Sequence, residues 1–122
     1  MNGFPDVETA LLELFADLAT CGTATPSDFG ASSLPFIRVI RIGGGDDRYT
    51  DSPRIGIDAF GADRMAAYNL AESVRQMLLA FPLVVSAGVI DRVITNTGPM
   101  EVDWGNINIR RFYAAYTVLL RR

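Results

Sequence analysis

Two apolar runs that flank a loop rich in glycine and aspartate constrain the fold of this chain most strongly. Residues 34–42 and residues 54–60 are dense in isoleucine, valine and phenylalanine, the types that strands favour. The eleven residues between them, 43–53, begin with three glycines and continue with three aspartates. Turn-forming residues between two strand-like runs are typical of a β-hairpin. The sequence therefore predicts two antiparallel strands joined by a long connection.

The composition of this connection suggests two kinds of ligand, and we expect neither. A phosphate-binding loop needs a lysine and a Ser/Thr that open a helix, whereas this loop returns into a strand. Carboxylates attract hard cations, and the acidic residues of this region are Asp46, Asp47, Asp51 and Asp58. They lack the spacing of an EF-hand, and acidic hairpin tips are ordinarily solvated. We therefore predict no metal site and no cofactor.

The rest of the chain predicts two helices and two further strands. Apolar residues recur at helical spacing in residues 4–21 and again in residues 62–81. Cys21-Gly22 is expected to end the first helix, with Gly22 as the left-handed capping residue. Residues 84–97 and 110–122 read as strands, the former with a break near Gly88. Gly98-Pro99 predicts a turn, followed by a polar loop that holds Trp104 as either a contact residue or a local lid.

These elements follow the order α-β-β-α-β-β. Each helix has a single apolar stripe, so the simplest packing is an α+β two-layer sandwich. We predict one domain over residues 1–122, with a four-stranded, mainly antiparallel sheet and both helices on one face. The strands are apolar on both sides, and soluble monomers rarely expose a large apolar patch. A protein partner is therefore expected on the second face of the sheet.

Composition excludes several classes of function. The chain has no histidine, which removes Ser-His-Asp and Cys-His catalysis, and its single cysteine, Cys21, cannot form an internal disulfide. No apolar run approaches the ~20 residues that span a membrane. The net charge is −3, which does not favour general nucleic-acid binding. We expect a protein that is not an enzyme, does not bind a membrane and folds in the cytoplasm.

Residues 38–55 resemble the tail terminator, or tail completion, proteins of long-tailed actinobacterial phages. The same pattern is matched by residues 62–75, residues 89–93, Gly98-Pro99, and Arg110-Arg111-Phe112 with Tyr116. The resemblance covers the chain from about residue 34 to its end. It implies a structural protein of the virion, located at the junction of tail and neck. Such a protein forms a ring, expected to be a hexamer, that caps the tail tube and joins the tail to the head-neck connector.

The resemblance also implies the partners: other copies of the chain, the tail tube protein and a head-closure or neck protein. Genomic DNA is expected to pass through the lumen of the ring without specific binding. The alternatives are another neck protein, such as a head-closure or adaptor protein, and, less favoured, a metal-dependent enzyme that uses the acidic loop. The candidate interface residues are Asp46, Asp47, Arg48, Tyr49, Asp51, Trp104, Arg110 and Arg111. We predict that Arg110 and Arg111 pair with acidic groups of the next subunit, and that Arg121 and Arg122 are ordinary strand-end charges.

Overall fold

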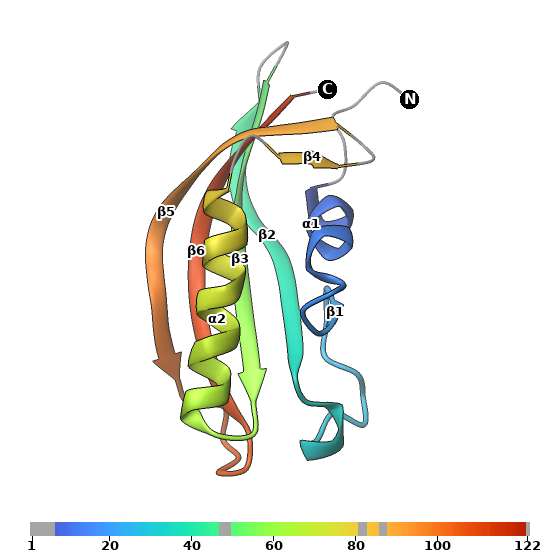
Figure 1. Ribbon diagram of the computed structural model, residues 1–122, viewed down its shortest axis with the longest axis vertical. Coiled ribbons are helices and arrows are strands. Elements are labelled where there is room, and N and C mark those ends of the chain that lie inside the picture. Colours follow the sequence, from blue (N-terminus) through green and yellow to red (C-terminus); the bar gives the residue numbers. More distant parts are fainter. Residues whose placement is uncertain (1–6, 47–49, 81–82, 86–87, 122) are drawn as a thin grey trace.

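The computed structural model describes residues 7–46, 50–80, 83–85 and 88–121. It is an α+β structure in which two helices cover one face of a six-stranded sheet (Figure 1). The strand order across the sheet is β1-β2-β3-β6-β5-β4. The elements in chain order are α1 (Val7–Phe15), β1 (Thr20–Gly22), the 3-10 helix η1 (Ala31–Ser33), β2 (Phe36–Asp46), β3 (Thr50–Gly61), α2 (Arg64–Leu79), β4 (Leu83–Val85), β5 (Gly88–Val102) and β6 (Arg110–Arg121).

The core lies between the helices and the sheet, as the apolar stripes predict. From α1, Leu11 and Phe15 are completely buried, and α2 contributes Val74 and Leu78 to the same cluster. The sheet meets them with alternate side chains of its central strands: Ile37, Val39, Ile55, Ile57, Ala114, Tyr116 and Val118. Burying one such aliphatic or aromatic side chain contributes about 1.5–3 kcal/mol. The prediction that both helices lie on one face is confirmed.

The hairpin of β2 and β3 is confirmed, but its connection is much shorter than predicted. The two strands pair continuously to Asp46 opposite Asp51, so most of residues 43–53 belongs to the strands. A register shift between Arg41 and Gly43 places one extra residue, Ile42, in β2. Glycine has low strand propensity, and the sequence pattern therefore missed strand pairing that the partner strand supports. Residues 47–49 lie outside the described residues.

The prediction of four strands is wrong, because two short strands flank the predicted sheet. Thr20–Gly22 does not end a helix: α1 ends at Phe15, and β1 pairs in parallel with the start of β2, which makes the sheet mixed. The break near Gly88 is correct, and there the chain reverses direction, so that β4 pairs antiparallel with β5. Three residues are too few to show any periodicity, so the sequence pattern missed β1, and it predicted β4 only as the start of the strand over residues 84–97.

The predicted turn at Gly98-Pro99 is also wrong, because both residues lie inside β5. The pairing of β5 with β6 shifts register three times, the last time between Thr97 and Met100. Bulges of this kind accommodate a proline without a ladder hydrogen bond. They also let β5 bend around the sheet, which is visible at the left of Figure 1.

The start of α2 is defined by two local contacts. The side chain of Asp63 accepts a hydrogen bond from the amide of Ala66 at 2.7 Å, which caps the helix. Gly61, at the end of β3, lies so close to this turn that a Cβ atom there would be 2.5 Å from the nitrogen of Ala67. Only glycine therefore allows the chain to pass from β3 into α2 along this path. Within the described residues, neither helix is long and apolar enough to cross a membrane.

Candidate assembly surfaces

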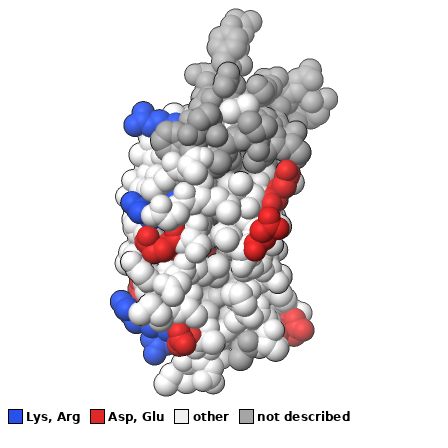
Figure 2. Space-filling view, in the orientation of Figure 1, with Lys and Arg blue, Asp and Glu red and all other residues white. Residues whose placement is uncertain are grey.

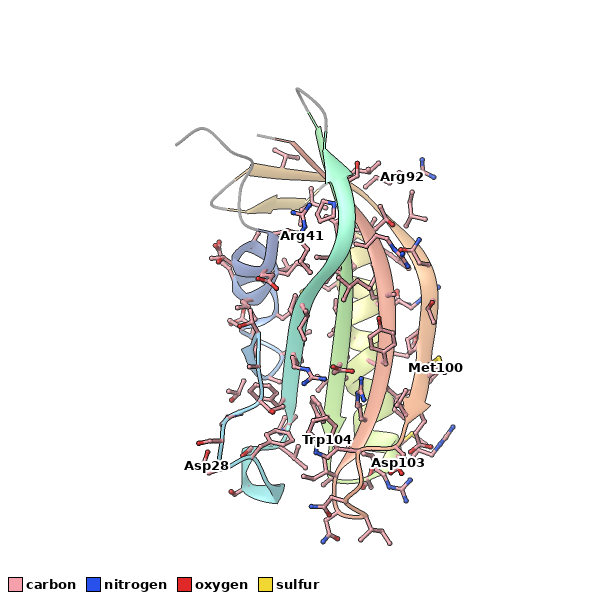
Figure 3. All side chains as sticks on the ribbon, turned by 180° about the vertical axis from the view of Figure 1, so that it is seen from behind. Asp28, Arg41, Arg92, Met100, Asp103 and Trp104 are labelled. Carbon is pink, nitrogen blue, oxygen red and sulfur yellow. The ribbon has the colours of Figure 1, made fainter. Side chains whose placement is uncertain are left out.

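The face of the sheet opposite the helices is covered at one end only. Seen from behind, the central strands lie in front of α2, and the segment around Trp104 lies at their lower end (Figure 3). Elsewhere on this face large apolar side chains are exposed: Ile42 is 47% exposed, Ile94 40% and Met100 50%. The ring of Tyr113 lies across Gly56, where a Cβ atom would be 3.0 Å from the ring. This open, partly apolar face is a candidate contact surface.

A charged cluster lies beneath the covered end of the face. Asp58, on β3, is 3% exposed and is the only charged residue that is buried in the described part of the chain. Its Oδ2 accepts hydrogen bonds from Nε and Nη2 of Arg38 at 2.8 and 2.6 Å, and its Oδ1 accepts one from Nε of Arg111 at 2.6 Å. The two guanidinium groups also lie 5.5 and 5.7 Å from the ring of Trp104. Charge-assisted pairs and cation–π contacts therefore join three strands to the loop after β5.

Trp104 is part of an aromatic cluster of its own chain. Its ring centroid lies 4.9 Å from that of Phe60 and 6.0 Å from that of Phe29, both in edge-to-face geometry. Phe29 in turn contacts Phe36 at 5.5 Å. Edge-to-face pairs add about 0.5–1.5 kcal/mol beyond burial. Of the two roles considered for Trp104, the structure assigns it that of a local lid; a contact with a partner stays a prediction.

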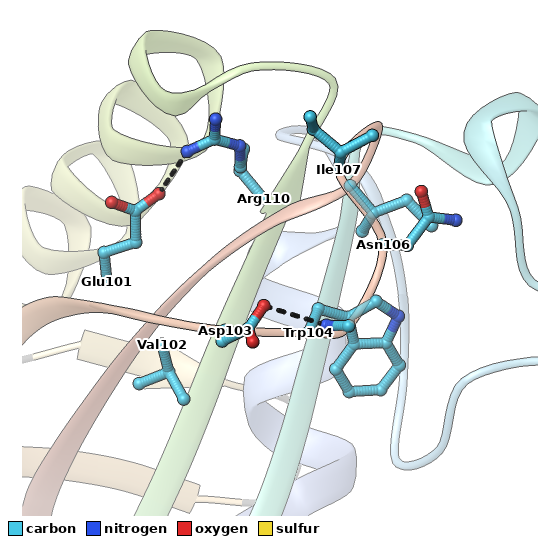
Figure 4. A pocket seen from close by; sticks show the side chains of 9 residues that line it. Glu101, Val102, Asp103, Trp104, Asn106, Ile107 and Arg110 are labelled. Carbon is cyan, nitrogen blue, oxygen red and sulfur yellow. Dashed lines mark hydrogen bonds and ion pairs between the residues drawn. The ribbon is translucent and has the colours of Figure 1, made fainter.

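A hollow of about 600 Å³ lies beside this lid, at the end of the sheet (Figure 4). The residues that line it come from the end of β5 and the loop that follows: Glu101, Val102, Asp103, Trp104, Gly105, Asn106, Ile107, Ile109 and Arg110. Asp103 Oδ1 accepts a hydrogen bond from the amide of Gly105 at 3.0 Å, which shapes the loop. Ile107, at the loop tip, is 82% exposed. The hollow is wide, and it contains no arrangement of groups typical of a catalytic site.

Arg110 and Arg111 both bind carboxylates of their own chain. Arg110 Nη1 lies 3.0 Å from Glu101 Oε2, and Arg64 of α2 approaches the other oxygen of Glu101 at 3.3 Å. These groups are well exposed, so the pairs contribute little to stability. Arg111 is engaged with the buried Asp58. That either arginine also reaches the next subunit stays a prediction.

The candidates in the hairpin lie largely outside the described part. Asp47, Arg48 and Tyr49 are outside it entirely, while the backbones of Asp46 and Asp51 pair at the end of the hairpin and their side chains are not described. Arg121 ends β6, its side chain also lies outside the described part, and Arg122 is not described. Asp58, which the sequence groups with the other aspartates, is instead bound by Arg38 and Arg111.

No chemistry typical of an enzyme is assembled by the described residues. They contain no group of three His, Cys, Asp or Glu side chains that could hold a metal ion. The thiol of Cys21 donates to the carbonyl oxygen of Ala19 at 3.2 Å, and burial raises its pKa. A raised pKa keeps a thiol protonated and unreactive at neutral pH.

Comparisons with known proteins agree with a structural role. The sequence profile of the phage tail termination protein family matches residues 3–117. Among solved structures, the fold is similar to a chain from the virion of a native gene transfer agent particle. The TM-score is 0.62 at 14% sequence identity, with 92% of this chain and 84% of that chain covered. No curated protein matches by sequence. The chain belongs to the phage tail termination protein family and is accordingly a structural tail protein of the virion.

Proposed function

We propose that this protein is a ring-forming tail terminator, which caps the finished tail tube and joins the tail to the head-neck connector. The observation that carries the proposal is the open sheet face with Ile42, Ile94 and Met100 exposed. An apolar surface of this kind marks an interaction site in a soluble protein. In a family of tail termination proteins, other copies of the chain and the end of the tail tube are the partners that fit it.

The ring is closed and repeats one head-to-tail contact around its axis, with six copies as the expected number. Heterologous contacts generate a ring when the rotation between neighbours closes. The lumen passes the genomic DNA without holding it, since each neutralised phosphate would add affinity and salt dependence. The net charge of −3 agrees with this weak interaction.

Deletion of the gene and measurement of tail length test the proposal. A particle that lacks its terminator should carry overlong tails, and supplying the protein in trans should restore the normal length. Leaky heads with tails of normal length would instead identify a head-closure or adaptor protein. Placement of the subunit in images of the virion neck then tests the ring, and a single copy at that position would contradict it.

A further inference from the structure

The two flanks of the molecule differ in charge. Residues 7–34, which include α1, β1 and η1, carry four acidic side chains, Glu8, Glu13, Asp17 and Asp28, and no basic one, since the first basic residue of the chain is Arg38. We call this side the acidic flank. Glu8 binds the backbone amide of Arg41 at 2.9 Å, while Asp17 and Asp28 are exposed to solvent. In the space-filling view basic side chains gather at the left edge, and acidic side chains lie at the right edge (Figure 2).

The opposite side, formed by β5 and the adjacent surface of α2, carries four arginines. We call it the arginine flank. Arg64 and Tyr68 show that this surface of α2 is turned towards β5 and β6, because they contact Glu101 and Phe112. The arginines of the flank are Arg64, Arg75, Arg92 and Arg110, and the carboxylates beside them are Glu72, Glu101 and Asp103. Arg92 is exposed, and Arg75 approaches Glu72 only to 4.0 Å.

Shape and apolar surface also differ between the flanks. The arginine flank exposes Tyr68, Ile94 and Met100 among its charges, and Tyr, Met and Arg are the residue types enriched in protein interfaces. The acidic flank exposes no large hydrophobic side chain within residues 7–34. It has instead a hollow of about 470 Å³ beside β1, whose walls include Pro26, Leu34 and Pro35. One flank therefore presents apolar side chains, and the other offers an apolar hollow.

We infer that the arginine flank of one copy docks on the acidic flank of the next copy. This inference rests on the proposed ring and identifies the surfaces that build it. The flanks lie at opposite sides of one sheet, so the contact is heterologous and repeats from copy to copy. Opposite charges favour contact between an arginine flank and an acidic flank, and like charges disfavour contact between two identical flanks. The apolar groups contribute affinity. A twofold contact would place like charges opposite each other and is disfavoured.

Two charge-reversed variants test the assignment. Variant one carries Asp17→Arg and Asp28→Arg on the acidic flank. Variant two carries Arg75→Glu and Arg92→Glu on the arginine flank. Neither pair is buried, so both variants should fold, which circular dichroism and thermal unfolding check. Met65→Glu, which adds a charge at an exposed position of α2 that neither flank includes, is the control.

Sedimentation velocity of each variant and of their mixture gives the result. Each variant alone should associate about a hundredfold more weakly than the wild type, because like charges then face each other across every contact. The equimolar mixture should assemble again, since copies of the two variants can alternate around a ring of even number with every contact attractive. The control should assemble as the wild type does.

The outcomes separate this inference from the proposed function. If wild-type rings form and both variants alone form them equally well, the assignment of the flanks is wrong and the ring stands. If the mixture fails to recover, the two flanks do not meet each other. If the wild-type chain stays monomeric in solution and on isolated tail tubes, the proposed ring and the inference both fall.

Discussion

Arg111 donates from its Nε atom to Oδ1 of Asp58 at 2.6 Å, although the two residues are 53 positions apart in the chain. Asp58 lies on β3 opposite Tyr113 of β6, so its carboxylate reaches the side chain two residues away along the partner strand. Arg38 approaches the other oxygen from β2. One carboxylate therefore holds two cations from two neighbouring strands.

Removing this carboxylate should destabilise the protein strongly. In Asp58→Asn, two largely buried guanidinium groups lose their counter-charge, and the free energy of unfolding should fall by about 3 kcal/mol. Urea unfolding followed by circular dichroism measures the change. The matched control is Glu101→Gln, which breaks exposed pairs and should cost less than about 1 kcal/mol. Equal losses in the two variants would contradict the structural role of Asp58.

Gly61→Ala should also destabilise the protein, by about 1–3 kcal/mol. The added Cβ atom would lie 2.5 Å from the nitrogen and 2.9 Å from the Cα atom of Ala67, both backbone atoms that cannot move without disturbing α2. Thermal unfolding provides the measurement. Gly98→Ala is the control, because no atom lies within 4 Å of the position of its Cβ. A Gly61→Ala protein as stable as the wild type would show that the start of α2 packs more loosely.

The hydroxyl group of Tyr116 is buried and has no hydrogen-bond partner among the described residues. Burial raises its pKa to about 12, with Arg75 lowering and Glu72 raising it by their charges. An unpaired buried polar group costs about 1–3 kcal/mol, so Tyr116→Phe should be as stable as the wild type or more stable near pH 7. A clear loss of stability at that pH would reveal a partner for the hydroxyl.

The same tyrosine makes stability depend on pH in a defined window. Its pKa is higher in the folded state than the ordinary value of 10, so the folded state binds more protons above pH 10. Stability is then fully present below pH 10 and falls as the pH rises to about 12. Tyr116→Phe lacks this ionisation, and its advantage over the wild type should grow across that window. Urea unfolding at pH 9, 10 and 11 measures the difference, and a constant difference would exclude the linkage.

Charges placed on the open sheet face should prevent assembly without unfolding the chain. Ile42→Lys changes a side chain that is 47% exposed, so thermal stability should change little. If the face is covered in the particle, the variant should fail to restore tail length in a gene-deletion strain. Met65→Lys, on the solvent side of α2, is the control and should restore it. Normal tails with Ile42→Lys would show that this part of the face stays open in the virion.

The sequence predicts the layers of this fold better than the extent of its strands. The stripes that hold Leu11, Phe15, Val74 and Leu78 repeat every three to four residues, and both helices follow from them. Gly43–Gly45 and Gly98-Pro99 read as loops, yet pairing with a partner strand holds them in the sheet. Such pairing depends on residues far away in the chain, so local propensity cannot predict it.

The charged cluster leaves one signal in the sequence. Asp58 interrupts an apolar strand between Ile57 and Ala59, which signals a paired charge in the core. The partners of Asp58 cannot be predicted from the sequence pattern, because Arg38 and Arg111 become its neighbours only when β3 lies between β2 and β6. The contact between the rings of Phe29 and Trp104 at the same end of the sheet likewise depends on the order of the strands.

The three register shifts of β5 bear on the life of the protein before assembly. A long, regular strand at the border of a sheet is a template on which any other extended chain can add. Beyond its short pairing with β4, β5 is such a border strand, and its bulges interrupt the even row of amides and carbonyls that a new strand needs. The irregular edge of β5 therefore disfavours the addition of strands from other, unfolded chains to a newly made subunit. The exposed apolar side chains of β5, Ile94 and Met100, then stay available for the neighbouring copy of the proposed ring.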